Sequence, residues 1–346
     1  MNSKKQILVT GGAGFIGSHT VVALIEAGYQ PIIVDTFENA YQFIIDGIEK
    51  ITSIKPKVYQ IDCCDLEAFN TVFEENNIEG VIHFAAYKAV GGSYETPLEY
   101  YSNNINTTIN LLRLMKTHRV DHLVFSSSAT VYGDPIKIPV DENESIKPAL
   151  SPYGNTKQIC EEIIQDTSKV EYPFHSTLLR YFNPIGAHES GIIGELPIGK
   201  PNNLVPYITQ ALSGKVAKLS LYGNDYDTPD GTCVRDYIHV LDLADAHLKA
   251  LSQLLKGREK LVDIINLGSG TGTSVLELIT NYEEATNLKV PFEFAPRRQG
   301  DVAVLYADPS KAKKELNWKV KYNIKDALSH SWKWQEYANV KLKDCE

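Results

Sequence analysis

Short apolar runs alternate with stretches of helical spacing through the first half of the chain. The runs fall at residues 7–10, 31–34, 58–61, 80–83, 122–126 and 174–179, and their aliphatic side chains are typical of buried strands. Two longer helices are predicted from Thr96-Pro97 to about residue 118 and from Ser151-Pro152 to about residue 168, since proline suits the first turn of a helix. Strands that alternate with helices predict an α/β fold with a doubly wound parallel sheet, covered on both faces.

The pattern changes after Arg180, where proline, glycine and asparagine become frequent. This composition predicts a smaller, irregular α/β domain that binds the substrate. A helical run near residues 240–255 and a strand near 264–267 look regular again. We therefore expect one domain over residues 1–182 with a return at about 237–266, and a second over 183–236 and 267–346.

Composition and charge narrow the classes of function. The chain has 346 residues, 43% hydrophobic and 22% charged, as in a globular protein with a sizeable core. A net charge of −9 argues against general binding to nucleic acid or anionic membranes. No apolar stretch is long enough to span a bilayer and no signal segment opens the chain, so we expect a cytoplasmic protein. The five cysteines show no metal-site spacing, so reduced thiols and no metal are expected.

The sequence TGGAGFIG at residues 10–17 follows the first predicted strand and opens the first helix. Gly11, Gly14 and Gly17 allow a tight turn and let a pyrophosphate approach the helix N-terminus, as in Rossmann-type dinucleotide sites. Asp35 ends the next strand, 18 positions beyond Gly17, where a carboxylate accepts hydrogen bonds from ribose hydroxyls. No arginine follows it to hold a 2′-phosphate, so NAD is favoured over NADP. Without that context, the glycines would indicate only a structural turn.

Two further segments follow predicted strands at the same edge of the sheet. Asp62 ends the third strand, where it would either bind the adenine amino group or cap the helix that contains Leu66. Both interpretations of Asp62 stay open. Residues 84–88 follow the fourth strand, where the crevice beyond the strand ends should hold the cofactor.

Tyr153 and Lys157 lie four residues apart near the start of a predicted helix and therefore share one face. A free phenol has a pKa of about 10, but an ammonium group and the positive ring of oxidised NAD would favour phenolate and lower that pKa. Lys157 would also hold the nicotinamide ribose. A serine among residues 126–128 would hydrogen-bond the reacting substrate oxygen and pass its proton to Tyr153. Taken alone, a Tyr153–Lys157 pair would indicate only an accidental contact on the protein surface. A cluster of serines would likewise indicate only a turn.

These elements, in this order, resemble the extended short-chain dehydrogenase/reductase family. Further motifs narrow the resemblance to UDP-galactose 4-epimerases: SSSATVYGD at residues 126–134, SPYG at 151–154, LRYFNP at 179–184, PNNL at 201–204, GTCVRDYIH at 231–239 and RRQGD at 297–301. The similarity runs from about residue 6 to past Trp318. It implies interconversion of UDP-galactose and UDP-glucose, in which tightly bound NAD takes the carbon-4 hydride and returns it to the opposite face of a 4-keto sugar.

The resemblance also implies roles for individual residues. Tyr153, Lys157 and Ser128 would be catalytic. The NAD site would comprise Gly11, Gly14, Phe15, Ile16, Gly17, Asp35, Asn39, Asp62, Cys63, Phe84, Ala85, Ala86, Lys88, Asn103, Ser126, Tyr153, Lys157 and Tyr181. The UDP-sugar site would comprise Lys88, Ser128, Tyr153, Asn183, Asn202, Asn203, Leu204, Tyr222, Arg235, Arg298, Asp301 and Leu305. Guanidinium groups suit a diphosphate, although Arg235 beside Asp236 and Arg298 near Asp301 would equally form ordinary salt bridges.

Two positions depart from the family pattern. Ala40 stands where a serine near the adenosine phosphates is common. Leu305 occupies a gate beside the sugar where tyrosine or cysteine is more usual. A tyrosine there would fill the space of an N-acetyl group, so leucine should also admit UDP-N-acetylglucosamine and UDP-N-acetylgalactosamine. Against this, leucine is bulkier than cysteine and offers the acetamido group no polar partner.

The resemblance further implies a homodimer in which helices 96–118 and 152–168 of two chains form a four-helix bundle. Tyr100, Ile105, Ile109, Leu112 and Met115 would supply the apolar surface, unless they belong to the core of one chain.

Three other functions compete on this scaffold. A nucleotide-sugar 4,6-dehydratase or decarboxylase would need acid/base groups beside the catalytic serine, where this chain has Ala129 and Thr130. A net dehydrogenase would release its reduced cofactor. A non-catalytic NAD-sensing protein would not need Ser128, Tyr153 and Lys157 together.

Overall fold

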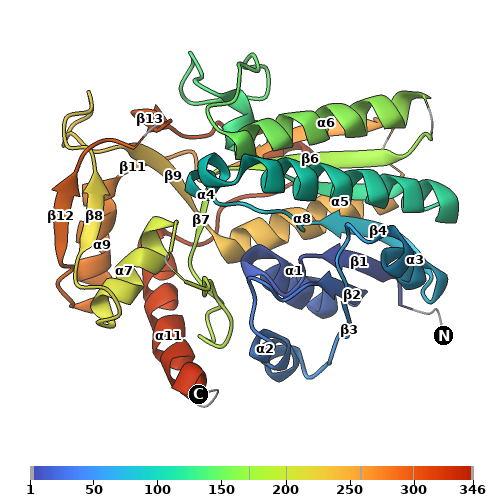
Figure 1. The fold of residues 1–346 in the computed structure, drawn as a ribbon, viewed down its shortest axis with the longest axis horizontal. Helices are drawn as coiled ribbons and strands as arrows, with labels where there is room; N and C mark the ends of the chain where they lie inside the picture. The colour runs from blue at the N-terminus through green and yellow to red at the C-terminus, as the bar shows by residue number, and fades with distance from the viewer. Residues whose placement is uncertain (1–3, 171, 200, 258, 299, 344–346) are drawn as a thin grey trace.

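The computed structural model describes residues 4–170, 172–199, 201–257, 259–298 and 300–343. Its centre is a seven-stranded sheet of parallel strands in the order β10-β6-β5-β4-β1-β2-β3 (Figure 1). The strands are β1 (Gln6–Thr10), β2 (Gln30–Asp35), β3 (Lys57–Gln60), β4 (Ile78–His83), β5 (His122–Ser128), β6 (His175–Tyr181) and β10 (Val262–Leu267). All seven coincide with predicted strands, so the predicted doubly wound α/β fold is confirmed.

Helices cover both faces of this sheet because both faces of its strands are apolar. Ile7 and Val9 of β1 enter a core under α1 (Phe15–Glu26), α2 (Phe43–Thr52) and α8 (Val240–Leu255). Leu8, which points the other way, enters a second core under α3 (Leu66–Glu74), α5 (Pro97–His118) and α6 (Pro152–Val170). This alternation explains why the strands have continuous apolar sequences.

The carboxyl ends of the strands mark the edge where a ligand can bind. The strand order reverses at β1, because β2 and β3 lie on one side of it and β4 to β6 on the other. Open α/β sheets bind ligands in the crevice at such a switch point. Here Gly11, which follows β1, approaches the segment after β4 so closely that a Cβ on it would lie 2.9 Å from the Ala85 nitrogen.

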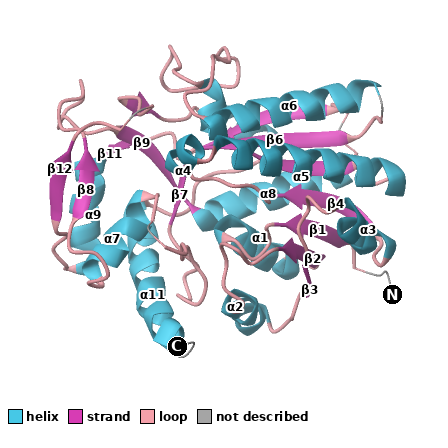
Figure 2. Cartoon of the chain, in the orientation of Figure 1, coloured by secondary structure: helices cyan, strands magenta, loops and turns pink. Residues whose placement is uncertain are grey.

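The rest of the chain builds a smaller region with mixed helices and short strands (Figure 2). In one sheet β9 (Val234–His239) pairs with β7 (Asn183–Ile185), β11 (Gly272–Ser274) and β13 (Val304–Leu305), and in another β8 (Leu219–Tyr222) pairs with β12 (Phe292–Ala295). A separate apolar core joins α7 (Leu204–Leu212), α9 (Val275–Thr286) and α11 (Ile324–Lys343). The short elements are α4 (Val90–Glu95), the 3₁₀ turn η1 (Ala129–Tyr132) and α10 (Ser310–Glu315). The predicted domain bounds stay a prediction.

Several residues predicted for a dimer surface lie in the core of the single chain. Leu112 and Met115 of α5 are buried in the core that α5 shares with α3 and α6, and Tyr100 of the same helix is buried as well. For these three residues the alternative, packing in the core of one chain, is therefore confirmed. Ile105 and Ile109 are half-buried. Ile105 packs in part against the same core, and the remaining surface of both residues stays a candidate for an interface.

Within the described ranges, no helix has the length and apolar character that a membrane crossing requires. Nor do three or more histidine, cysteine, aspartate or glutamate side chains of these ranges gather as a metal ion would require.

Candidate active site

The loop between β1 and α1 has the shape of a dinucleotide cradle. Gly11 has a φ of +67°, and a Cβ on Gly17 would stand 2.1 Å from the Gly11 oxygen, so both positions require glycine. Gly14 precedes α1 without a side-chain capping bond, and the first turn contains no acidic residue. The first N–H groups of α1 therefore have no capping partner, and the helix dipole adds positive potential there. The cradle fits a pyrophosphate.

Asp35 lies at the end of β2, beside this cradle. Its Oδ2 accepts a hydrogen bond from the Ala13 nitrogen and its Oδ1 one from the Phe37 nitrogen, each at 2.9 Å. Burial raises the pKa of the carboxyl group, and these backbone bonds oppose that shift. The carboxylate retains lone pairs for ribose hydroxyls. The nearby charge of Glu38 would add to its repulsion of a 2′-phosphate.

The structure rules out one of the two interpretations of Asp62. The strand β3 ends at Gln60, and Asp65 is the residue that caps α3, since its side chain accepts from the Ala68 nitrogen at 3.0 Å. Asp62 instead accepts from the Cys64 nitrogen at 2.8 Å within the preceding turn. The capping interpretation of Asp62 is therefore wrong, and its exposed carboxylate stays a candidate for adenine recognition.

Other predicted NAD residues lie near the carboxyl ends of the same strands. The Lys88 ammonium is 5.9 Å from the centroid of the Phe15 ring. The Asn103 side-chain oxygen accepts from the Cys64 thiol at 3.7 Å. Cys63 is buried, and burial raises the pKa of its thiol well above the usual value. The remaining candidates follow β1, β2 and β4 in the chain: Ile16, Asn39, Phe84 and Ala86.

Tyr153 and Ser128 meet where α6 begins and β5 ends, and both are buried. The Ser128 oxygen accepts hydrogen bonds from the Thr130 nitrogen at 3.2 Å and from the Thr130 hydroxyl at 3.0 Å. With its lone pairs engaged, Ser128 has its own proton available for the hydrogen bond with the Tyr153 phenol. Thr130 cannot act as an acid or base, but it orients Ser128, a role that sequence reasoning missed.

Lys157 is held one turn further along α6. Its ammonium donates to the Ser126 carbonyl at 2.8 Å and lies 4.9 Å from the centroid of the Phe125 ring. Burial lowers the pKa of Lys157 to about 8, against the charge of neighbouring groups. The Ser126 hydroxyl in turn forms a hydrogen bond with Tyr181 on β6. Hydrogen bonds thus join three of the predicted cofactor contacts, Lys157, Ser126 and Tyr181.

The expected lowering of the Tyr153 pKa does not arise from the protein's own groups. Burial raises this pKa to about 12, and the hydrogen bond with Ser128 offsets it only in part. The Lys157 ammonium is directed to the Ser126 carbonyl. The phenol therefore holds its proton at neutral pH unless another positive charge adjoins it.

Asp301 pairs with two predicted substrate residues, Arg235 and Arg298, and a third, Tyr222, lies against Arg298. Its carboxylate oxygens lie 3.0 Å from Arg298 Nε and 3.5 Å from an Arg235 nitrogen. The Arg298 guanidinium is 5.0 Å from the centroid of the Tyr222 ring. Asp236 accepts its hydrogen bonds elsewhere, so the alternative of an Arg235–Asp236 salt bridge is wrong, whereas Arg298 and Asp301 do pair. Residue 299 of this motif lies outside the described ranges.

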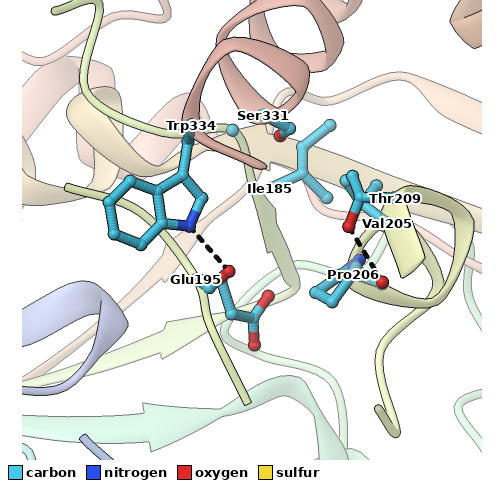
Figure 3. Close-up of a pocket in the computed structure, with 8 residues that line it drawn as sticks. Ile185, Glu195, Val205, Pro206, Thr209, Ser331 and Trp334 are labelled. Atoms are coloured by element: carbon cyan, nitrogen blue, oxygen red, sulfur yellow. Dashed lines mark hydrogen bonds between the residues drawn. The ribbon is translucent and has the colours of Figure 1, made fainter. Parts of the chain in front are cut away.

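Lys88 and Asn203 meet at a residue that sequence reasoning missed. The Lys88 ammonium and the Asn203 amide both donate to one oxygen of Glu195, at 2.8 and 2.7 Å. The Glu195 carbonyl accepts from the Trp334 indole at 2.9 Å, and Figure 3 shows the carboxylate extending away from that ring. Glu195 therefore links the segment after β4 to the start of α7. Its only sequence signal is its place shortly before the PNNL motif.

Leu305 lies between the arginine cluster and the catalytic serine. It pairs with Arg235 in the register of β13 and β9. It also packs against a small core that contains Ala129, the neighbour of Ser128. This position fits the predicted gate.

The last three predicted substrate residues lie on surface segments. Asn183 opens β7 and is exposed, Leu204 opens α7, and the exposed Asn202 has its side-chain oxygen 3.6 Å from where a Cβ on Gly91 would stand.

The amino-acid sequence is similar to those of known proteins over nearly its full length. A family model described as GDP-mannose 4,6 dehydratase matches residues 8–330. The UDP-glucose 4-epimerase of Dictyostelium discoideum is 51% identical over 330 residues, which cover 95% of each chain. That of Bacillus subtilis (strain 168) is 49% identical over 334 residues, covering 96% of this chain and 97% of its own. The chain belongs to the UDP-glucose 4-epimerase family.

A solved epimerase structure agrees with this membership. The UDP-glucose 4-epimerase of Bifidobacterium longum, crystallised with NAD⁺ and UDP, superimposes with a TM-score of 0.94 at 46% identity, over 97% of this chain and 99% of that one. The chain also belongs to the wider family that the dehydratase model describes. Residues 126–133 contain no carboxylic acid, so the acid/base group that a dehydratase would carry just after the catalytic serine is absent from that segment.

Proposed function

We propose that this protein interconverts UDP-galactose and UDP-glucose by epimerisation at carbon 4 of the sugar. The observation that carries the proposal is the buried Ser128–Tyr153 pair, in which Thr130 leaves the serine proton directed to the phenol. This pair lies at the same edge of the sheet as the glycine cradle. A base that deprotonates a sugar hydroxyl beside a dinucleotide is what carbon-4 oxidation and reduction require.

The catalytic residues have distinct tasks. Tyr153 takes the proton of the carbon-4 hydroxyl and gives it back at the end of the cycle. A relay through Ser128 would first have to break one of its hydrogen bonds from Thr130, which engage both serine lone pairs. Lys157, anchored on the Ser126 carbonyl, would hold the nicotinamide ribose, and the positive ring of oxidised NAD would supply the charge that favours the phenolate. Hydrogen bonds to Thr130 and to the Ser126 carbonyl hold Ser128 and Lys157 in position, which favours orientation of the reacting groups.

The cofactor is NAD, which when bound supplies a reversible acceptor for the carbon-4 hydrogen. Gly11 and Gly17 shape its cradle, and Asp35 would hold the adenosine ribose. Because the hydrogen returns to the same carbon, the reaction has no net redox change.

The nucleotide must be held firmly while the sugar turns over. Arg235 and Arg298 would bind the diphosphate, and Tyr222 would offer an aromatic face to the uridine. Lys88 and Asn203, which both donate to Glu195, would contact the substrate from the segment after β4 and from the start of α7. Anchoring through UDP alone leaves the 4-keto sugar free to present either face.

We propose in addition that N-acetylated UDP-sugars are accepted. Leu305 carries this part, because its short side chain leaves the volume that a tyrosine would fill. The neighbouring Tyr306 does not replace it, since its ring lies against Gly272, where a Cβ would come within 3.0 Å. Leucine avoids the steric clash that a tyrosine would make with the N-acetyl group. This gain outweighs the missing hydrogen bond to the acetamido group, because such a bond contributes only about 1 kcal/mol of net binding free energy. The ratio of kcat/KM for the two substrate pairs measures this directly.

The remaining parts of the proposal concern assembly, location and domain division. We propose a homodimer in which α5 and α6 of two chains pair, with Ile105 and Ile109 at the contact, and a cytoplasmic location. The domain division is proposed as residues 1–182 with 237–266, and 183–236 with 267–346. Sedimentation of the purified protein tests the dimer, and a single species of monomer mass would refute it.

Product identification tests the function itself. Purified protein is incubated with UDP-galactose without added cofactor, and the products are separated and identified. UDP-glucose supports the epimerase, a 4-keto-6-deoxy sugar would support a dehydratase, and no turnover would support a binding protein.

A further inference from the structure

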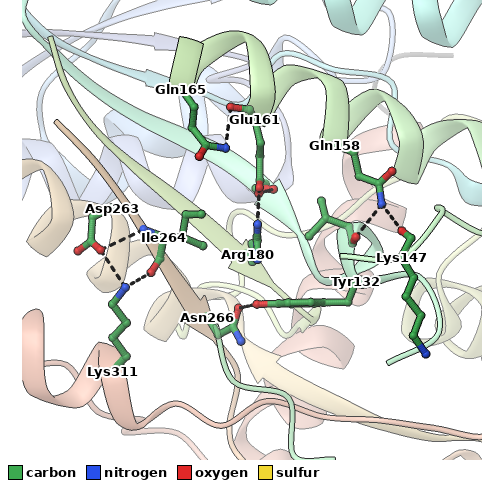
Figure 4. Close-up of polar contacts among 12 residues, drawn as sticks. Tyr132, Lys147, Gln158, Glu161, Gln165, Arg180, Asp263, Ile264, Asn266 and Lys311 are labelled. Carbon is green, nitrogen blue, oxygen red and sulfur yellow. Dashed lines mark hydrogen bonds and ion pairs between the residues drawn. The ribbon is translucent and has the colours of Figure 1, made fainter. Parts of the chain in front are cut away.

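A buried ion pair lies directly behind the catalytic residues. Glu161 is on α6, one turn beyond Lys157 and two beyond Tyr153, and Arg180 is on β6. Arg180 Nε donates to Glu161 Oε1 at 2.9 Å, and a second guanidinium nitrogen donates to Oε2 at 2.5 Å (Figure 4). Both side chains are at most 5% exposed. The pair is therefore bidentate and almost fully removed from water.

The same carboxylate also holds the strand that carries the catalytic serine. The Ser127 hydroxyl donates to Glu161 Oε1 at 2.5 Å. Side chains alternate along a strand, so Ser127 points away from the side of β5 on which Ser126 and Ser128 lie. In the register of the sheet, Ser127 is paired with Arg180 and Ser128 with Tyr181. One carboxylate thus joins β5, β6 and α6 at the level of the site.

The arginine holds the chain on the other side of Ser128. Tyr132 lies in the turn η1 that follows this serine, and the Arg180 guanidinium is 4.8 Å from the centroid of its ring. The Tyr132 hydroxyl donates to the Asn266 side-chain oxygen at 2.7 Å. Ser128 is therefore bracketed by Ser127 and Tyr132, and both contact the same ion pair.

We propose that Glu161 and Arg180 are positioning residues, which hold Ser128 against Tyr153 and keep Lys157 on the Ser126 carbonyl. Stability alone does not account for such a pair, because buried ion pairs are often replaced by apolar residues at little cost. A satisfied bidentate pair does fix the relative position of the elements it joins. The Glu161 charge also raises the pKa of Lys157 against the effect of burial.

The test removes both charges together, in the double variant Glu161→Leu/Arg180→Met. Apolar residues of similar size avoid an unpaired buried charge but leave the buried Ser127 hydroxyl without its acceptor, so the melting temperature should fall by a few degrees while the protein stays folded. Positioning predicts that kcat falls about tenfold or more, because small displacements of reacting groups are costly. KM for UDP-galactose should change by less than about threefold, since the UDP contacts lie on other elements. A folded double variant with wild-type kcat would overturn the proposal.

A control uses the ion pair of the buried Asp263 on β10 and the half-buried Lys311 on α10, whose atoms lie 2.8 Å apart (Figure 4). The variant Asp263→Leu/Lys311→Met removes the same kind of charges away from the site and should leave kcat unchanged. An equal loss of kcat in this control would show a general effect of charge removal and contradict positioning.

Ser127→Ala keeps the proposal testable if the double variant does not fold. It deletes one hydrogen bond and leaves the ion pair intact, so it should lower kcat several-fold with little change in KM or melting temperature. Wild-type kcat in Ser127→Ala would then overturn the proposal. The inference rests on the proposed epimerase function, but the two fail in different ways. An inactive wild type would refute the function, whereas variants with wild-type activity would refute the positioning role of Glu161 and Arg180.

Discussion

Replacing Tyr153 by phenylalanine removes one buried oxygen and leaves the ring in place. Burial raises the pKa of this phenol to about 12, so forming phenolate at pH 7 costs about 7 kcal/mol with the protein's own groups. The positive ring of oxidised NAD must offset much of that cost, since the Lys157 ammonium is directed to the Ser126 carbonyl. Phenylalanine deletes the base altogether, and Tyr153 is too buried for bulk water to replace it. General acid–base catalysis contributes about 10²–10⁴-fold, so kcat should fall by that factor, equivalent to about 3–5 kcal/mol.

The fold should tolerate Tyr153→Phe. Ser128 keeps both hydrogen bonds from Thr130, so the loss of stability should be about 1 kcal/mol. NAD should remain bound in an unchanged ratio, because the glycine cradle and Asp35 are untouched. Tyr282→Phe is the matched control: it deletes a buried phenol oxygen in the separate core of α7, α9 and α11 and should leave kcat unchanged.

The assay follows conversion of UDP-galactose to UDP-glucose at saturating substrate, with bound NAD measured in the same samples. A rate within twofold of wild type, with NAD still bound, would refute the assignment of Tyr153 as the base. If the rate and the amount of bound NAD fell together, the claim that Tyr153 acts in catalysis and not in NAD binding would be refuted.

Three other outcomes follow from the structure. Asp35→Ala should weaken NAD binding and relax discrimination against NADP, and mass spectrometry that finds NADP released from the denatured wild type would contradict the role of Asp35. Leu305→Tyr should selectively suppress turnover of the N-acetylated substrates, and undetectable N-acetylated turnover by the wild type would sink dual specificity. Burial lowers the pKa of His19 and of His239 to about 3 from 6.5, so the unfolded chain binds more protons and stability should fall as the pH drops from 6.5 towards 3. Urea midpoints at pH 7 and pH 5 check this, and an unchanged midpoint would contradict it.

The large sheet could be predicted because its strands are buried on both faces and therefore read as apolar runs. The smaller region could not, for the opposite reason. β13 has only two residues, and β12 exposes Phe292 and Phe294, so neither has a distinctive pattern. The pairing of β12 with β8 joins segments about 70 residues apart, which no local pattern encodes.

The candidate site divides in the same way. The glycine cradle and Asp35 follow consecutive strands, so a local pattern was sufficient to place them together. Glu195 meets Lys88 across 107 residues of chain, and only the folded protein brings them into contact. Glu161 did carry a local signal, since it continues the four-residue spacing of Tyr153 and Lys157, but that spacing does not reveal its arginine partner.

The central claim is that one hydrogen leaves carbon 4 and returns to the same carbon within a single active site. UDP-galactose labelled with deuterium at carbon 4 tests it most directly, when incubated with the purified protein in ordinary water without added cofactor. The account predicts UDP-glucose that retains the deuterium at carbon 4, with inverted configuration. Product that has lost the label to solvent, or that lacks the carbon-6 hydroxyl, would contradict it.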